Sequence, residues 1–217
     1  QQKRFNQEHN YVTIKSKQKQ IDRIKEQLVP PPPKKEHIRF AFPCKTAHGT
    51  DVLLAQGLSF DTGKQRLFSD VELDIKFGER IFLLGSNGCG KSTLMKSLVG
   101  KIPLQSGSVR IADWIKTGYF DQLQDLRFQS EKSILDFVWD EFPQLTKTQV
   151  MSALAVFRIR GEEALKPMNK ISGGEAAKTV LLKIMLSGPN LLLFDEPTNH
   201  LDLEAREALI DALDGYE

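Results

Sequence analysis

The sequence has few cysteines and no long apolar run. Its two cysteines, Cys44 and Cys89, are too few for a disulfide framework and suit a reducing compartment. A membrane-spanning helix needs roughly 18 to 20 consecutive apolar residues, whereas the most apolar region, 179–194, is interrupted by Lys183 and by the polar turn 187–190. The first residues also lack the apolar core of a secretory signal. These absences predict a cytoplasmic protein without a membrane domain.

What is present is the composition of an ordinary globular domain, with 40% hydrophobic and 27% charged residues among 217. The net charge of +2 conceals an asymmetry, because residues 1–39 hold ten Lys or Arg and four Asp or Glu. The N-terminal arm is therefore basic and the remainder is mildly acidic. A basic arm favours polyanions such as nucleic acid, although the same charges also suit a solvated helix face.

The basic arm is predicted to be a helix over residues 1–28. Four apolar residues recur there at heptad-like spacing: Ile14, Ile21, Ile24 and Leu28. Prolines 30–33 end this helix, because proline lacks the N–H group and clashes with the preceding turn, and they form a short stiff spacer. We therefore expect a basic helical linker over residues 1–37, ending in a tetraproline, and a compact domain over residues 38–217.

Strand and helix patterns alternate within this domain. Period-two alternation or short apolar runs predict strands at 38–42, 54–60, 67–77, 81–84, 109–120 and 191–194. Helix-forming stretches are found at 91–99, 130–164, 176–186 and 203–213. The all-apolar runs 81–84 and 191–194 are expected to be buried central strands, and both lead into polar loops. This arrangement indicates an α/β nucleotide-binding core.

A glycine-rich loop follows the run 81–84 and matches the pattern G-x-x-x-x-G-K-[ST]. Its residues are Gly85, Ser86, Asn87, Gly88, Cys89, Gly90, Lys91 and Ser92, with Thr93 next. Glycines let the backbone approach a phosphate, and the N-terminus of the following helix adds partial positive charge. We expect residues 85–93 to bind ATP, with Lys91 on the β- and γ-phosphates and the Ser92 hydroxyl on Mg²⁺.

Two acidic residues follow the second apolar run. Asp195 comes directly after residues 191–194 and is expected to hold the Mg²⁺ shell. Glu196 comes next and is expected to orient and polarise the attacking water, which makes it the candidate catalytic residue. A further Ser-Gly-Gly-Glu sequence precedes a predicted helix and suits anion binding. Its residues are Ser172, Gly173, Gly174 and Glu175.

Together these motifs resemble the ATPase domain of the ABC superfamily. The resemblance covers residues 38–217 and also includes Gln122 and the Asn-His-Leu-Asp sequence at 199–202. It implies an α/β fold with an ABC-type P-loop ATPase core: a mixed sheet, an antiparallel β-subdomain and a helical signature subdomain, preceded by a linker helix. It also implies that Gln122 joins Ser92 and Asp195 around the metal. In that family two domains meet head to tail, so that residues 172–175 of one close on the γ-phosphate held by the other.

Two stretches indicate one sub-family of the ABC superfamily, the ABC-F proteins. Residues 195–202 and the Tyr-Phe-Asp-Gln sequence at 119–122 are both similar to the corresponding ABC-F sequences. The charged helix and proline break resemble the linker between the two ATPase domains of one ABC-F chain. ABC-F proteins lack membrane domains and act on ribosomes, as translation factors or as protectors against ribosome-targeting antibiotics. The implied partners are a second ABC ATPase domain, and ribosome, rRNA or tRNA bound through the basic linker.

Two features depart from the family pattern. The family usually places an adenine-stacking aromatic two residues after Phe60, where this chain has Thr62. Either stacking is weak, or Phe60 or another aromatic takes over. The family's switch histidine is expected beyond residue 217, so this segment alone is expected to hydrolyse ATP poorly. His200 belongs to the 199–202 sequence and is not that histidine.

Other function classes share parts of this pattern. The ATPase subunit of an ABC membrane transporter is the alternative, but such subunits usually start almost directly at the first strand, without a basic helix and tetraproline. A chromosome-maintenance ATPase would need a coiled-coil arm between Gln122 and Ser172, where too few residues are present. A nucleotide-binding module without turnover of its own is a further alternative.

Overall fold

The structure is a computed structural model that describes residues 17, 19, 38–43, 49–121 and 130–216. The chain divides into two units, Gln1–Glu36 and His37–Glu217. Lys17 and Lys19 are the described residues of the first unit, and both are helical and exposed. The rest of the predicted linker helix and its proline spacer lie outside the described residues. Within the described ranges, no helix is long and apolar enough to cross a membrane.

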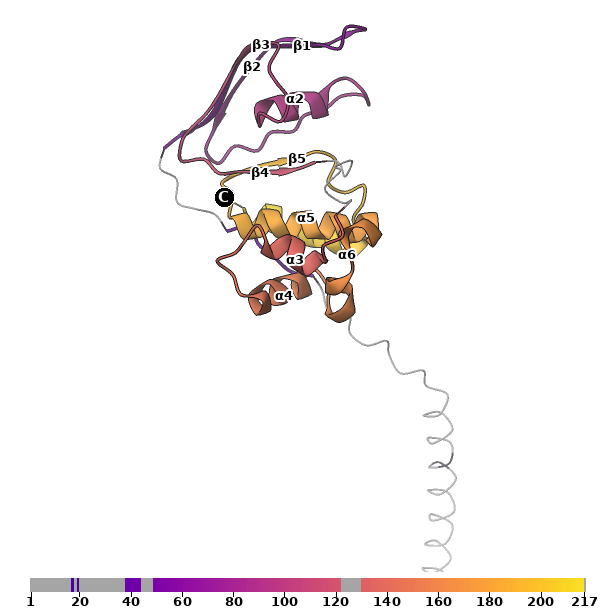
Figure 1. Cartoon of the computed structure of the whole chain (residues 1–217). Coiled ribbons are helices and arrows are strands. Elements are labelled where there is room, and N and C mark those ends of the chain that lie inside the picture. The colour runs from indigo at the N-terminus through magenta and orange to yellow at the C-terminus, as the bar shows by residue number, and fades with distance from the viewer. Residues whose placement is uncertain (1–16, 18, 20–37, 44–48, 122–129, 217) are drawn as a thin grey trace, which may run out of the picture. The chain divides into compact units, whose positions relative to one another are not determined.

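An antiparallel sheet forms one part of the second unit. Its order is β2-β1-β3, from β1 (Asp51–Asp61), β2 (Arg66–Lys76) and β3 (Ser106–Ile111). Helix α2 (Lys91–Leu98) lies against this sheet (Figure 1) and buries Leu94 and Leu98 in one cluster with four residues of β1: Val52, Leu53, Ala55 and Leu58. The apolar side chains of β1 therefore pack with α2 in one cluster.

A parallel pair of strands and a group of helices form the other part. Strand β4 (Thr117–Phe120) pairs in register with β5 (Leu191–Phe194). The helices gather on one face of this pair (Figure 1): α3 (Ile134–Trp139), α4 (Lys147–Val156), α5 (Gly173–Ser187) and α6 (Leu203–Asp214). Two 3₁₀ turns connect α4 to α5: η2 (Gly161–Leu165) and η3 (Met168–Lys170). Their apolar side chains form a second core that includes Phe120 and Leu181.

The structure confirms the α/β class, but it corrects three predicted strands. Residues 81–84 are neither helix nor strand and have no pairing strand among the described residues, and they are exposed, with Phe82 at 83% and Leu84 at 88%. An apolar run forms a buried strand only where another strand pairs with its backbone, and neither sheet does so here. The predicted buried strand at 81–84 is therefore wrong for this chain.

The other two corrections concern residues 38–42 and 109–120. Residues 38–42 are not a strand, although Ile38 and Phe42 are buried, and the ring of Phe42 packs near those of Phe194 and Tyr216. The ring centroid of Phe40 lies 4.7 Å from that of Phe157. The predicted strand 109–120 is two strands, since a turn closed by Ile115 N–H donating to Ala112 C=O separates β3 from β4. The end of β3 therefore belongs to the antiparallel sheet, and β4 to the parallel pair.

Candidate nucleotide-binding site

The glycine-rich loop passes directly into α2, as the motif predicted. Gly90 precedes the first helical residue with φ of +105°, and no side chain caps the helix. The first-turn N–H groups of α2 are therefore left for a ligand, as in other anion-binding helix N-termini. The Lys91 ammonium turns back over the loop and donates to the carbonyl oxygens of Gly85 at 2.8 Å and Ser86 at 3.0 Å.

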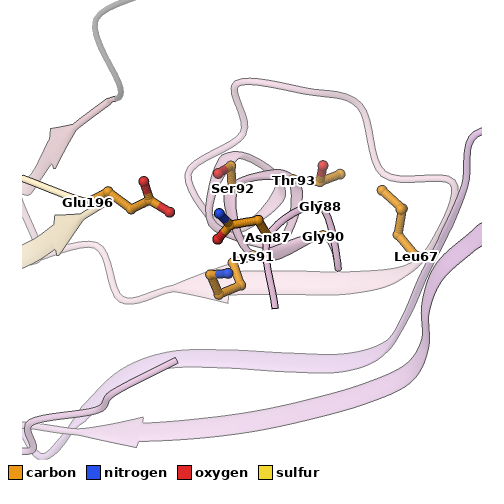
Figure 2. A pocket seen from close by; sticks show the side chains of 8 residues that line it. All are labelled: Leu67, Asn87, Gly88, Gly90, Lys91, Ser92, Thr93 and Glu196. Atoms are coloured by element: carbon orange, nitrogen blue, oxygen red, sulfur yellow. The ribbon is translucent and has the colours of Figure 1, made fainter. Parts of the chain in front are cut away.

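A pocket of about 310 Å³ lies over this loop. It is lined by residues from three separate segments of the chain: Leu67, Asn87, Gly88, Gly90, Lys91, Ser92, Thr93 and Glu196. Figure 2 shows the Glu196 carboxylate extending towards the loop from one side, with Leu67 at the opposite side. The fold thus brings the predicted P-loop, its lysine and its serine together with the predicted catalytic carboxylate.

Asp195 occupies the end of β5 next to Glu196. Its backbone N–H donates to the Phe120 carbonyl at 3.0 Å, which continues the β4–β5 pairing by one residue. The side chain is 2% exposed, and its Oδ2 atom has no hydrogen-bond partner among the described residues. A buried carboxylate oxygen without a donor fits a cation, because a hard divalent ion takes oxygen ligands and compensates the buried charge.

Glu196 has an unusual backbone for a residue with a side chain. Its φ is +48°, in the left-handed region, which costs about 1–2 kcal/mol relative to an ordinary conformation. The side chain is exposed in the pocket, and its Oε2 accepts a hydrogen bond from Asn199 Nδ2 at 2.7 Å. The carboxylate therefore faces the P-loop pocket and is hydrogen-bonded by Asn199 of the loop that follows Glu196.

The predicted signature, residues 172–175, begins α5 as a capping box. Ser172 Oγ accepts from the Glu175 N–H at 3.2 Å, and Glu175 Oε2 accepts from the Ser172 N–H at 2.8 Å. Burial alone would raise the pKa of Glu175, but the Lys166 ammonium and the Ser172 donors lower it to about 2. None of these four residues lines the P-loop pocket. Within this chain the signature and the P-loop therefore belong to separate surfaces.

Two sequence-predicted positions have different outcomes. Gln122 lies outside the described residues, directly after Asp121. Thr62 is part of the β1–β2 turn, where its hydroxyl donates to the Gln65 carbonyl at 3.0 Å and accepts from the Gln65 N–H at 3.2 Å. A threonine can close this turn in a way that an aromatic residue cannot, so the position has a structural use here. The adenine-stacking residue stays a prediction.

A larger pocket of about 560 Å³ lies along β1 and β3, near Trp114. Its charged residues already neutralise one another, because Lys76 Nζ lies 2.9 Å from Asp51 and 2.7 Å from Asp74. It contains no glycine-rich turn before a helix, and none of its residues in the described ranges has a buried carboxylate oxygen without a donor. The P-loop pocket is therefore the better candidate site, although it is smaller.

Comparison with known proteins identifies the family. A family model described as ABC transporter matches residues 68–199, which is more than half of the chain and includes the P-loop, the signature and Glu196. The chain belongs to the ABC transporter family. Among solved structures, this ABC domain is similar to a dimeric ATP-binding cassette in a post-hydrolysis state bound to ADP and Pi, with a TM-score of 0.60 over 74% of this chain and 81% of that chain. At 19% identity this likeness shows the shared fold.

Sequence relatives of this ABC domain support the resemblance to ABC-F proteins. YdiF of Bacillus subtilis, an ATP-binding protein by name, is 37% identical over 202 residues, which is 93% of this chain and 31% of that protein. ABC transporter F family member 5 of Arabidopsis thaliana is 30% identical over 92% of this chain and 29% of its own length. These relatives confirm the predicted resemblance. The chain spans about a third of the length of the curated relatives it matches.

Two residues of the ABC site were missed from the sequence, Leu67 and Asn199. Leu67 belongs to β2, far from the P-loop in sequence, and no local pattern connects it to residue 90. Asn199 was noted as part of the sequence 199–202, without a role of its own. Asn199 lies three residues after Glu196, with Pro197 between them. This spacing could have indicated a turn in which the asparagine side chain bonds to the glutamate.

Proposed function

We propose that this chain is an ATPase domain that binds ATP in the P-loop pocket and hydrolyses it with Glu196. One observation supports the proposal above all: Glu196, more than 100 residues from the P-loop in sequence, lines the same pocket as Lys91 and Ser92. Lys91 supplies a positive charge for the β- and γ-phosphates, and the uncapped N-terminus of α2 supplies N–H donors. Residues 85–93 would surround the triphosphate.

Mg²⁺ fits the residues of this site. Asp195 has a buried oxygen without a donor, and the Ser92 hydroxyl lines the pocket. Serine and aspartate oxygens are ligands that Mg²⁺ accepts, and Gln122 would join them from its position after β4. When bound, the ion would neutralise charge on the phosphate oxygens.

In the proposed hydrolysis, the Glu196 carboxylate accepts a proton from the attacking water. The water oxygen forms a bond to the γ-phosphorus, and the bond from that phosphorus to the bridging oxygen breaks. The bridging oxygen keeps the electron pair and leaves as part of ADP, while a proton of the water passes towards the Glu196 carboxylate. The left-handed backbone of Glu196 suits this role, because it turns the side chain from the end of β5 into the pocket.

Residues 172–175 would act on a second domain rather than on this one. They do not line the P-loop pocket of their own chain, and the serine begins a helix whose N-terminus attracts anions. We therefore propose the head-to-tail pairing that the family resemblance implies. The domain over residues 38–217 would pair with a second ABC ATPase domain, and the segment by itself would turn over slowly.

The proposed setting is the second ATPase domain of an ABC-F protein that engages ribosomes, with residues 1–37 as its basic linker to the first domain. A relative with an F-family name and the +6 charge of residues 1–39 support this setting. The same two features disfavour the transporter alternative. A role in translation or in protection from ribosome-targeting antibiotics belongs to this proposal.

The test uses the full-length protein and two single variants. Lys91→Ala should reduce ATP affinity at least 100-fold, since the variant loses the charge that meets the phosphates. Glu196→Gln keeps the shape of the side chain and removes the carboxylate, so ATP should still bind while hydrolysis falls by about 100-fold or more. Isothermal titration calorimetry measures the first effect and steady-state phosphate release measures the second.

Lys132→Ala is the matched control, because Lys132 pairs with Asp140, directly after α3, and does not line the pocket. It should change neither quantity. Unchanged ATP affinity in Lys91→Ala would contradict the binding site. Hydrolysis at the parent rate in Glu196→Gln would contradict the catalytic role.

A further inference from the structure

The Glu196 carboxylate is held by a side chain that the predicted machinery does not include. Asn199 Nδ2 donates to Glu196 Oε2 at 2.7 Å, and the Asn199 N–H donates to the Glu196 carbonyl at 3.3 Å. Both bonds connect the same two residues across one tight turn that contains Pro197. The amide nitrogen is the only donor of an asparagine side chain, and a carboxylate only accepts, so the orientation of the amide is determined.

The turn itself is anchored to α6. Arg206, in the first turn of α6, donates through Nη2 to the Thr198 carbonyl at 3.1 Å. At the other end of the loop, Asp202 caps α6 by accepting from the Ala205 N–H at 2.8 Å, and it also accepts from Lys178 of α5. Asn199 therefore projects from a loop whose backbone is fixed on both sides, although its own side chain is exposed.

We infer that Asn199 is a positioning residue for Glu196 in ATP hydrolysis. The inference rests on the proposed function, because it assigns a role relative to the Glu196 carboxylate. A glutamate at the end of a strand has several side-chain rotamers, and those that turn away from the P-loop pocket are unproductive. The Asn199 hydrogen bond selects a rotamer in which the carboxylate lines that pocket.

The chemistry requires a neutral donor at this position. A lysine or arginine would pair with the carboxylate and weaken it as a proton acceptor, and an aspartate would repel it. An amide orients one oxygen by a single hydrogen bond and carries no charge. Correct orientation should raise the rate of hydrolysis, because displacing a reacting group by roughly 1 Å can lower a reaction rate by about 100-fold.

The experiment measures hydrolysis and binding separately in the full-length protein. Asn199→Ala removes the donor, and Asn199→Asp keeps the shape while placing a like charge beside Glu196. Both should lower kcat, by about 10- to 100-fold in Asn199→Ala and by more in Asn199→Asp. The Kd for ATP should change less than about threefold, because Asn199 does not line the pocket. Asn169→Ala is the matched control, since Asn169 is equally exposed and lies on η3.

A double variant distinguishes positioning from a general structural role. In Glu196→Gln the hydrogen bond no longer orients a carboxylate, so adding Asn199→Ala should leave the residual single-turnover rate nearly unchanged. Full additivity of the two losses, or a parent kcat in Asn199→Ala, would overturn the inference. A loss of ATP binding in Asn199→Ala would overturn it as well, because a positioning residue changes kcat alone. A parent rate in Glu196→Gln would instead overturn the proposed function.

Discussion

Gly90 shows how strongly one residue can be constrained by a distant neighbour. A Cβ atom at this position would lie 2.9 Å from Leu67 Cβ, and the φ of +105° is a conformation that side-chain-bearing residues rarely adopt. The sequence motif requires glycine here for the approach of a phosphate. The structure adds a second reason, which is the contact of the P-loop with β2.

We predict that Gly90→Ala lowers the free energy of unfolding by about 2–4 kcal/mol, since it adds overpacking to left-handed strain. Urea denaturation measures this change. Gly88→Ala is the matched control, because Gly88 has a φ of +81° and no atom within 4 Å of its would-be Cβ, so strain alone should apply. Replacing Leu67 with Gly in the Gly90→Ala background removes the Cβ at 2.9 Å and should recover part of the loss, measured against Leu67→Gly alone. No recovery would contradict the contact as its cause.

Helices α4 and α5 both begin with a capping box, so the contributions of the two boxes to stability and to hydrolysis can be compared. Thr146 and Gln149 form a capping box at α4, just as Ser172 and Glu175 do at α5. The two boxes satisfy the same backbone donors and should contribute similar stability. Only the box at α5 belongs to the proposed signature. Its serine should therefore have a role in hydrolysis that the threonine lacks.

We predict that Ser172→Ala and Thr146→Ala each reduce the free energy of unfolding by about 1 kcal/mol. In the full-length protein, only Ser172→Ala should also lower the rate of ATP hydrolysis, because its hydroxyl would meet the γ-phosphate of the second domain. Chemical denaturation and steady-state phosphate release measure the two effects on the same samples. Equal hydrolysis rates in the two variants would contradict the assignment of residues 172–175 to the active site.

The distribution of charge is a property of the whole molecule. The excess of positive charge lies in residues 1–39 of the sequence, whereas the pocket is lined by residues between Leu67 and Glu196. Two of these residues, Lys17 and Lys19, are exposed where the structure describes them. An arm of this charge would neutralise phosphates of RNA and release counterions on binding. Ribosome binding should then depend on salt through this arm more than through the domain.

We predict that replacing five linker cations with Gln weakens ribosome binding and flattens its salt dependence: Lys15, Lys17, Lys19, Arg23 and Lys25. Co-sedimentation of the full-length protein with ribosomes over a salt series measures both quantities. The control replaces five exposed cations of the domain: Lys64, Lys116, Lys132, Lys147 and Lys170. Equal slopes for the parent and the linker variant would contradict the proposed role of the arm.

Most residues of the candidate site could be located from the sequence, because their motifs depend on local spacing. The P-loop, Asp195 and Glu196 are each defined by neighbours within a few residues, and the structure places Glu196, directly after Asp195, in the same pocket as the P-loop. The strands with clear alternation, such as β1, and the helices with caps, such as α5, were predicted near their observed bounds for the same reason. Local propensity and local patterning agree at these positions.

The remaining features depended on partners that are distant in sequence. The apolar run 81–84 satisfies the pattern of a buried strand, but burial requires a neighbouring strand, and neither described sheet provides one. Residues 38–42 alternate like a strand, yet Ile38 and Phe42 are buried, and Phe40 packs on Phe157, without a pairing strand among the described residues. Hydrogen-bond pairing and packing are decided between elements, so a single segment cannot reveal them.

The sequence by itself therefore determined the family, the glycine-rich loop before α2 and the acidic pair after β5, because those follow from residue type and spacing along the chain. The tertiary structure alone decided that Leu67 closes on Gly90, that Thr62 belongs to a turn, and that Glu196 faces the P-loop while Asn199 holds its carboxylate. These contacts depend on how β2, the P-loop and the loop before α6 meet in space. Folding brings those three segments together, and no local pattern encodes the distances between them.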